Sequence, residues 1–254
     1  MSENRIVGGK ADISYSSVDT FFEERGKSGL KHKYNYVMYL DETPEVAVQR
    51  DRQAKTKVEE LLDIREGMTV LDLGCGIGRW GELFCRKGAY YIGVDSSAKM
   101  IEMAQENLRD YQNKKLLVCN LRDLDDALRI IGNEGAFKCD IVFFCGVLMY
   151  LNDADVKAVL GKIPDVINAD CRICFIESIA EGSRLTLKDI YSQELKQNYS
   201  AIYRTAEEFR QLMAEAFGGK IVFLQDELLD FEDGLQKKRE HVTMEHCMLW
   251  GAVD

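Results

Sequence analysis

The sequence predicts an α/β fold: a doubly wound, mostly parallel seven-stranded sheet with helices on both faces. Short apolar runs alternate with amphipathic segments between about residue 67 and residue 177. Strands that are apolar on both faces and separated by helices are typical of a parallel sheet that is covered on both sides. The chain has 254 residues, of which 46% are hydrophobic, so it can bury the core of one large domain.

Seven apolar runs are predicted as strands and four amphipathic stretches as helices. The strands are expected at Thr69–Leu73, Tyr90–Asp95, Lys115–Cys119, Asp140–Phe144, Cys171–Glu177, Lys220–Leu224 and His246–Val253. The helices are expected at Gly78–Lys87, Ser97–Tyr111, Asp153–Asn168 and Thr205–Ala216. Residues 178–204 are expected to form a polar stretch.

The first third of the chain differs in pattern from the rest. Residues 1–20 are polar and are expected to be loosely ordered. Thr43 and Pro44 are typical of a helix cap and a first helical residue, and the helix is expected to run to about Ile64. We therefore predict an N-terminal helical cap at residues 1–66 and the main domain at residues 67–254, with its late part serving as a lid.

Composition excludes several classes of protein. The net charge of −10 argues against binding to nucleic acid, and no run of about 18–20 apolar residues could span a membrane. The first residues lack the apolar core of a signal peptide, so a cytoplasmic protein is expected. Eight cysteines lie mostly in apolar runs, which favours reduced thiols. Cys171 and Cys174 form a CxxC in a strand-like run without a partner pair, so no metal site is expected.

The most informative segment is a glycine-rich loop that follows the first predicted strand. It reads Val70-Leu-Asp-Leu-Gly-Cys-Gly-Ile-Gly78, and Asp95 ends the next strand, 21 positions after Gly74. Such glycines let the backbone approach a ligand closely, and a carboxylate at that strand end can accept hydrogen bonds from both hydroxyls of a ribose. The pattern predicts a nucleotide site at the carboxyl edge of the sheet.

A dinucleotide is one alternative for that nucleotide. Gly76-Ile-Gly-Arg-Trp-Gly81 formally matches the dinucleotide fingerprint, but that register leaves Asp72 unexplained within the strand. The Tyr-x-x-x-Lys of a short-chain dehydrogenase is matched in spacing by Tyr111 and Lys115, which precede the third strand. An NAD-dependent oxidoreductase is therefore a weaker reading of the sequence.

The runs VLDLGCGIGRW and YYIGVDSS closely resemble the first two motifs of class I S-adenosylmethionine-dependent methyltransferases. The resemblance implies the Rossmann-like fold of that family, with S-adenosylmethionine as cofactor and S-adenosylhomocysteine as product. It implies that the glycine loop packs against the methionine part and that Asp95 binds the ribose. The cofactor-binding residues that it implies along the domain are Gly74, Cys75, Gly76, Asp95, Ser96, Met100, Asn120, Leu121 and Cys145. The family often has Asp where Asn120 stands.

The N-terminal segment looks like the cap of some small-molecule N-methyltransferases. That likeness implies that Arg50 holds the carboxylate of the cofactor and that Tyr39 covers its sulfonium. Tyr34, Tyr36 and Arg52 are rival candidates. The alternative is ordinary, with the arginine on a solvated helix face and the tyrosine in a minor core.

Methyl transfer needs an aligned acceptor and a base within hydrogen-bond reach of it. Three residues near the predicted carboxyl edge of the sheet are candidates: Tyr150, Glu177 and His241. Tyr150 takes a place where many of these enzymes carry His. Each has a structural alternative, respectively a packing aromatic, a solvated strand end and a loop residue.

The expected acceptor is a small molecule, methylated on oxygen or nitrogen without a metal. The sequence lacks the Asn/Asp-Pro-Pro-Tyr tetrapeptide of base methylation and the acidic set of catechol-type enzymes. The late cations suggest an anionic or sugar-like acceptor, such as a natural product or a surface-polysaccharide building block, unless they only pair with nearby acids. These cations are Arg184, Lys188, Arg204, Lys237, Lys238 and Arg239. A tRNA or protein methyltransferase and a non-enzymatic binding module are the further alternatives.

Overall fold

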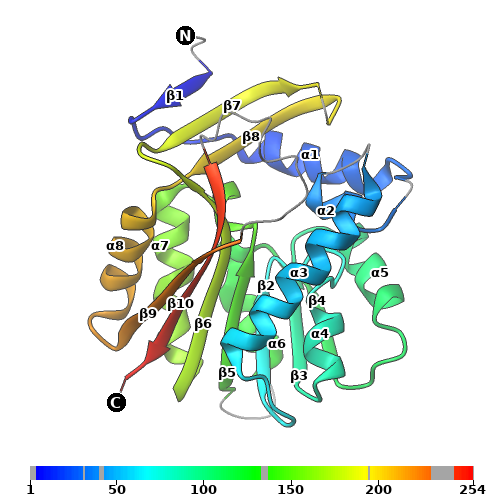
Figure 1. Cartoon of the computed structure of the whole chain (residues 1–254), viewed down its shortest axis with the longest axis vertical. Helices are drawn as coiled ribbons and strands as arrows, with labels where there is room; N and C mark the ends of the chain where they lie inside the picture. Colours follow the sequence, from blue (N-terminus) through cyan, green and yellow to red (C-terminus); the bar gives the residue numbers. More distant parts are fainter. Residues whose placement is uncertain are drawn as a thin grey trace.

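The computed structural model describes residues 4–30, 32–39, 43–132, 137–193, 195–229 and 243–253. Their central element is a seven-stranded sheet with the strand order β4-β3-β2-β5-β6-β10-β9 (Figure 1). The strands are β2 (Thr69–Leu73), β3 (Tyr90–Asp95), β4 (Lys114–Val118), β5 (Cys139–Cys145), β6 (Ile167–Ala180), β9 (Ile221–Leu228) and β10 (Thr243–Ala252). Strands β2 to β6 pair in parallel, and β10 runs antiparallel to both of its neighbours. The predicted fold class is confirmed.

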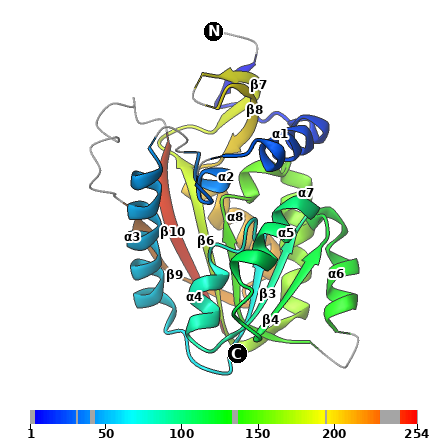
Figure 2. The ribbon, with the colours of Figure 1, turned by 90° about the vertical axis from the view of Figure 1, so that its right-hand side faces the viewer.

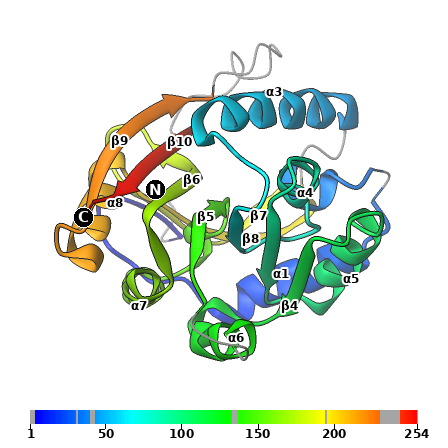
Figure 3. The same ribbon diagram turned by 90° about the horizontal axis from the view of Figure 1, so that it is seen from below.

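Helices cover both faces of this sheet, as Figure 3 shows from below. One apolar core joins the sheet to α3 (Pro44–Leu62), α4 (Gly81–Arg86) and α5 (Ala98–Asn107). The core on the other face is shared with α6 (Leu124–Ile131), α7 (Asp153–Lys162) and α8 (Ala206–Phe217). Helix α3 begins at Pro44 as predicted, and its buried residues Ala47, Ala54, Val58 and Leu62 recur at helical spacing. Within the described ranges, no helix is long and apolar enough to cross a membrane.

The prediction of a helix from Asp153 to Asn168 is wrong at its end. Helix α7 ends at Lys162 and a short 3₁₀ turn, Ile163–Asp165, follows it. Pro164 has no backbone N–H to donate and its ring clashes with the preceding turn, so the helix cannot continue through it. Ile167 and Asn168, which were predicted to be helical, belong instead to the long strand β6.

A second, three-stranded sheet lies above the carboxyl edge of the first (Figure 2). It consists of β1 (Arg5–Val7), β7 (Leu185–Ser192) and β8 (Gln197–Tyr203), all paired antiparallel. Helices α1 (Tyr15–Lys27) and α2 (Asn35–Met38) lie beneath it. The prediction of loose order before residue 20 is therefore wrong for the residues described. The stretch at 178–204, which was predicted only as polar, contains strands β7 and β8. Pairing between β1 and β7, which are distant in sequence, orders both segments.

Candidate functional site

The glycine loop joins β2 to α4 and tolerates no side chain at its first position. Gly74 has φ +83°, and a Cβ placed there would lie 2.4 Å from Cγ2 of Val147. The backbone nitrogens of Gly74 and Cys75 both donate to the carbonyl of Val94, at 2.8 and 3.0 Å. The loop is thus pinned to β3 and packed against the segment that follows β5. Only glycine fits a backbone that approaches this closely.

Asp95 ends β3 and connects the glycine loop to α5. Its Oδ2 accepts from the backbone nitrogen of Gly76 at 2.8 Å, and its Oδ1 accepts from that of Ser97 at 2.9 Å. Burial raises the pKa of Asp95, although the two backbone hydrogen bonds act in the opposite direction. Each carboxylate oxygen retains a further lone pair with which it can accept from a ligand hydroxyl.

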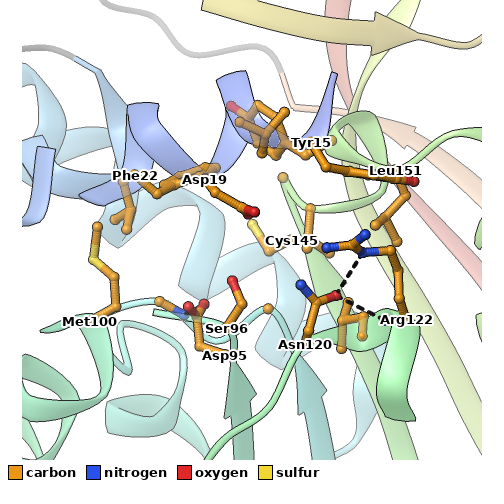
Figure 4. A pocket seen from close by; sticks show the side chains of 18 of the residues that line it. Tyr15, Asp19, Phe22, Asp95, Ser96, Met100, Asn120, Arg122, Cys145 and Leu151 are labelled. Atoms are coloured by element: carbon orange, nitrogen blue, oxygen red, sulfur yellow. Dashed lines mark hydrogen bonds between the residues drawn. The ribbon is translucent and has the colours of Figure 1, made fainter. Parts of the chain in front are cut away.

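The first cavity brings together most of the predicted cofactor residues (Figure 4). Those that line it are Tyr39, Gly74, Gly76, Asp95, Ser96, Met100, Asn120, Leu121 and Cys145. Figure 4 shows Tyr15, Asp19 and Phe22 of α1 facing this set from the other side. The sequence analysis did not identify these residues of α1 as part of the cavity wall, although a dense group of aromatic residues begins at Phe21. The Oδ1 atom of Asn120 accepts from the backbone nitrogen and Nε of Arg122, at 3.0 and 3.2 Å.

A second, larger cavity of about 480 Å³ adjoins the first. The two share Val37, Tyr39, Gly74, Gly76, Cys145, Gly146 and Tyr150, which we call the seam. Beyond the seam, the second cavity is bounded by the β7–β8 hairpin, the start of β10 and the polar residues of α3 and the glycine loop. Cys75 and Arg50 line this cavity rather than the first. All the predicted cofactor residues therefore lie around two connected spaces.

Four tyrosine hydroxyls form a chain along the second cavity. The oxygen of Tyr150 lies 2.9 Å from that of Tyr39 and 3.1 Å from that of Tyr199, and Tyr199 lies 3.2 Å from Tyr203. Burial raises the pKa of Tyr39, Tyr150 and Tyr199. These phenols are therefore neutral at physiological pH, and Tyr150 stands at the seam as a hydrogen-bonding group rather than as an ionised base.

Glu177 is buried behind the seam and lines neither cavity. It is 2% exposed, so the alternative of a solvated strand end is wrong. Its Oε1 accepts from the backbone nitrogens of Val147 and Leu148, at 2.9 and 2.8 Å, and its Oε2 has no described partner. Burial raises the pKa of Glu177 to about 7. The carboxyl group holds the turn that carries Tyr150.

The third candidate for the base, His241, lies outside the described residues.

Two of the late cations are engaged in ion pairs away from the cavities. Arg184 and Arg204 each contact Oδ1 of Asp153, at 2.9 and 2.8 Å, and Arg184 also pairs with Glu208 at 3.0 Å. For these two arginines the alternative of pairing within the protein therefore holds, although the partner carboxylates are distant in sequence. Lys188 lines neither cavity. Lys237, Lys238 and Arg239 lie outside the described residues. Among those described, no group of three His, Cys, Asp or Glu side chains could hold a metal ion.

Arg79 is a charged residue of the second cavity that the sequence analysis missed. It is 8% exposed, and it donates to Oδ1 of Asp51 at 3.2 Å and to Sγ of Cys145 at 3.2 Å. Its guanidinium carbon lies 4.7 Å from the ring centre of Trp80. The position of Arg79 directly after the glycine loop is the sequence feature from which it could have been identified.

The rival candidates to Tyr39 and Arg50 do not line either cavity. These are Tyr34, Tyr36 and Arg52.

Comparisons with known proteins agree with this geometry. Residues 71–173 match the family model described as a methyltransferase domain. A phosphoethanolamine N-methyltransferase 1 of Triticum aestivum is 32% identical over 114 residues, 44% of this chain and 22% of that protein. A tRNA (uracil(54)-C(5))-methyltransferase of Pyrococcus horikoshii is 30% identical over 100 residues, 39% of this chain and 24% of that protein. The chain thus spans about a quarter of the length of these curated relatives.

Two solved structures share the fold over nearly the whole chain. A phosphoethanolamine N-methyltransferase 1 of Haemonchus contortus has a TM-score of 0.67 at 16% identity, over 94% of this chain and 48% of that one. A 1,6-didemethyltoxoflavin-N1-methyltransferase of Burkholderia thailandensis has a TM-score of 0.63 at 14% identity, over 100% of this chain and 98% of that one. The strand order and the glycine loop are those of the Rossmann-like methyltransferase fold, and residues 71–173 match a methyltransferase domain.

Proposed function

We propose that the protein transfers a methyl group from S-adenosylmethionine to an oxygen or nitrogen of a small molecule. The observation that carries this proposal is the seam between two connected cavities. One cavity has a strand-end carboxylate and a glycine loop suited to a nucleoside, and the other has room for a small acceptor. When bound, S-adenosylmethionine supplies an electrophilic methyl group, and the seam is the place where donor and acceptor meet.

The cofactor roles follow from which cavity each residue lines. Asp95 accepts from the ribose hydroxyls, while Ser96, Met100, Asn120 and Leu121 surround the adenosine. Gly74, Gly76 and Cys145 contact the methionine part at the seam, and Cys75 contacts it from the second cavity. Arg50 pairs with its carboxylate, and Tyr39 lies beside the sulfonium. The absence of a side chain at Gly74 lets the loop pack directly against Val147, with which a Cβ would clash.

Catalysis rests on alignment, and we propose that it proceeds without a metal. Holding donor and acceptor in line can supply several kcal/mol of the barrier. Tyr150 hydrogen-bonds the acceptor at the seam, and Glu177 positions Tyr150 through the turn behind it. We retain His241 as a third candidate. The division into a cap at residues 1–66 and a catalytic domain at 67–254 is part of this proposal.

The acceptor is proposed to be sugar-like or anionic, as in a natural product or a surface-polysaccharide building block. Hydroxyl groups from Ser178, Ser192, Thr243 and the tyrosines line the second cavity, which suits a polar molecule with several hydroxyls. Arg50 and Arg79 supply positive charge on the side of the cavity near the glycine loop. Because Arg50 is assigned to the carboxylate of the cofactor, it is the charge of Arg79, rather than that of the late cations, that supports an anionic group on the acceptor.

Calorimetric titration with S-adenosylmethionine, S-adenosylhomocysteine and NADH tests the cofactor first. We expect micromolar binding of both adenosyl compounds and no binding of NADH. Binding of NADH alone would overturn the proposal and favour hydride chemistry. The alternative of a tRNA acceptor is tested by binding to total tRNA, which would fall steeply with salt if the phosphate backbone were recognised.

A further inference from the structure

Glu245 is a charged residue of the second cavity to which the proposed reaction has so far given no role. It lies on β10 and faces Ser178 of β6 in the strand register, and both residues line the cavity. Within the described part of the chain, its carboxylate has neither a hydrogen bond nor an ion pair. Glu245 is partly buried and lines the cavity, so its carboxylate oxygens can accept hydrogen bonds from a ligand bound there.

The charged neighbours of Glu245 do not form an ion pair with its carboxylate. Arg79 and Arg50 are the cations whose charges act on it, and Arg79 already pairs with Asp51 at 3.2 Å. Neither arginine comes within ion-pair distance of the Glu245 carboxylate. Burial outweighs both charges and raises the pKa of Glu245, which brings this carboxylate closer to the proton affinity that a base needs near neutral pH.

The place of β10 in the sheet puts Glu245 on the acceptor side of the seam. Strand β10 lies two positions beyond β5 in the strand order, and neighbouring strands are about 4.8 Å apart, so the separation is about 10 Å. The glycine loop lies on the other side of β5, after β2. Glu245 is therefore displaced from the part of the seam that contacts the methionine moiety, and it faces the space left for the acceptor.

We propose that Glu245 binds the reacting amine of the acceptor and takes a proton from it. This inference rests on the proposed function and narrows its acceptor to a molecule with a protonated amine at the reacting end. The carboxylate removes one proton from the bound ammonium group and becomes a carboxylic acid. The lone pair released on nitrogen forms the new bond to the methyl carbon, while the C–S bond breaks and its electron pair stays on sulfur.

The aromatic wall of the cavity supports the same class of acceptor. Tyr39, Tyr150, Tyr199 and Tyr203 line the space that Glu245 also lines. Aromatic rings attract cations through the negative potential over their faces. A carboxylate together with neutral phenols therefore suits an ammonium group better than a second carboxylate at the reacting end.

Three probes of matched shape and different charge test the assignment. Protein saturated with S-adenosylhomocysteine is titrated with 2-phenylethylamine, 2-phenylethanol and 3-phenylpropionate, and binding is followed by NMR chemical-shift changes at pH 7. We expect the wild type to bind the amine at least tenfold more tightly than the acid. In Glu245→Gln this preference falls to less than threefold, while the dissociation constant of S-adenosylhomocysteine stays within twofold. The control Glu227→Gln, on β9 and outside both cavities, keeps the wild-type preference.

The outcomes separate this inference from the proposed function. If the wild type fails to bind S-adenosylhomocysteine, the proposed function itself is wrong. If S-adenosylhomocysteine binds but the probes show no preference for the amine, or do not bind, the assignment of Glu245 is wrong. An amine preference that survives in Glu245→Gln also refutes it. A loss of cofactor affinity above tenfold in that variant would place the carboxylate in the cofactor site instead.

Discussion

Removing the charge of Glu177 is expected to change how stability depends on pH. The substitution Glu177→Gln keeps a side-chain oxygen that can accept from the backbone nitrogens of Val147 and Leu148, so the turn behind the seam retains its two hydrogen bonds. What it removes is a carboxyl group whose pKa burial raises from 4.5 to about 7. The effect on stability is therefore attributable to ionisation rather than to lost contacts.

The magnitude follows from the shift in pKa between the unfolded and the folded state. A rise from 4.5 to about 7 corresponds to about 3 kcal/mol, at 1.36 kcal/mol per pKa unit. Because the folded pKa is raised, the wild type has this stability in full below pH 4.5. It loses the stability as the pH rises to about 7, where the buried carboxyl group ionises. The Glu177→Gln variant has no such loss.

Urea unfolding followed by circular dichroism between pH 4 and pH 9 measures this difference. We expect the free energy of unfolding of Glu177→Gln, relative to that of the wild type, to rise by about 3 kcal/mol from pH 4 to pH 8. The control Glu60→Gln, an exposed position on α3, reports the effect of removing a surface carboxylate. A difference between Glu177→Gln and wild type that stays flat over this range would refute the reasoning, because the carboxyl group would then titrate alike in both states.

Three further substitutions test the seam and the first cavity. Asp95→Ala is expected to weaken binding of S-adenosylhomocysteine by about 3 kcal/mol, roughly a hundredfold, because charged hydrogen bonds to the ribose are lost; unchanged affinity by calorimetry would refute the ribose assignment. Tyr150→Phe should lower turnover more than tenfold and leave cofactor affinity within twofold, whereas full activity would return this tyrosine to a packing role. Gly74→Ala should abolish cofactor binding even when combined with Val147→Ala, since the Cβ atoms still meet at 2.7 Å and the positive φ remains; binding by the double variant would contradict this.

The sheet and the first cavity could be predicted from sequence because their determinants are local. Strands β2 and β3 match the predicted ranges residue for residue, since each is a short apolar run bounded by turn residues. Asp95 and the glycine loop are close in sequence and meet across one βαβ unit. The resemblance to class I methyltransferases, carried over position by position, then identified Ser96, Met100 and Asn120, which line the same cavity as that loop.

The second cavity could not be predicted because its walls come from pairings between distant segments. The hairpin β7–β8 is ordered partly by β1, which precedes it by about 180 residues in the chain. Glu245 becomes a cavity residue because β10 inserts antiparallel beside β6, and no local motif marks that insertion. The side-chain partners of Arg184 and Arg204 are likewise distant in sequence. Charge runs alone could not distinguish ligand-facing cations from those that pair within the protein.

The segment after β5 explains why polar residues near the strand ends have two different roles. Glu177 accepts from the N–H groups of Val147 and Leu148, while Arg204 donates to the carbonyls of Leu148 and Leu151, at 2.7 and 2.6 Å. The backbone of this turn is thus held from both sides by buried charged groups. Because Tyr150 lies within the turn, its hydroxyl is fixed between the two cavities. A reaction that depends chiefly on alignment needs such a fixed seam, and this need accounts for charged residues that touch neither ligand.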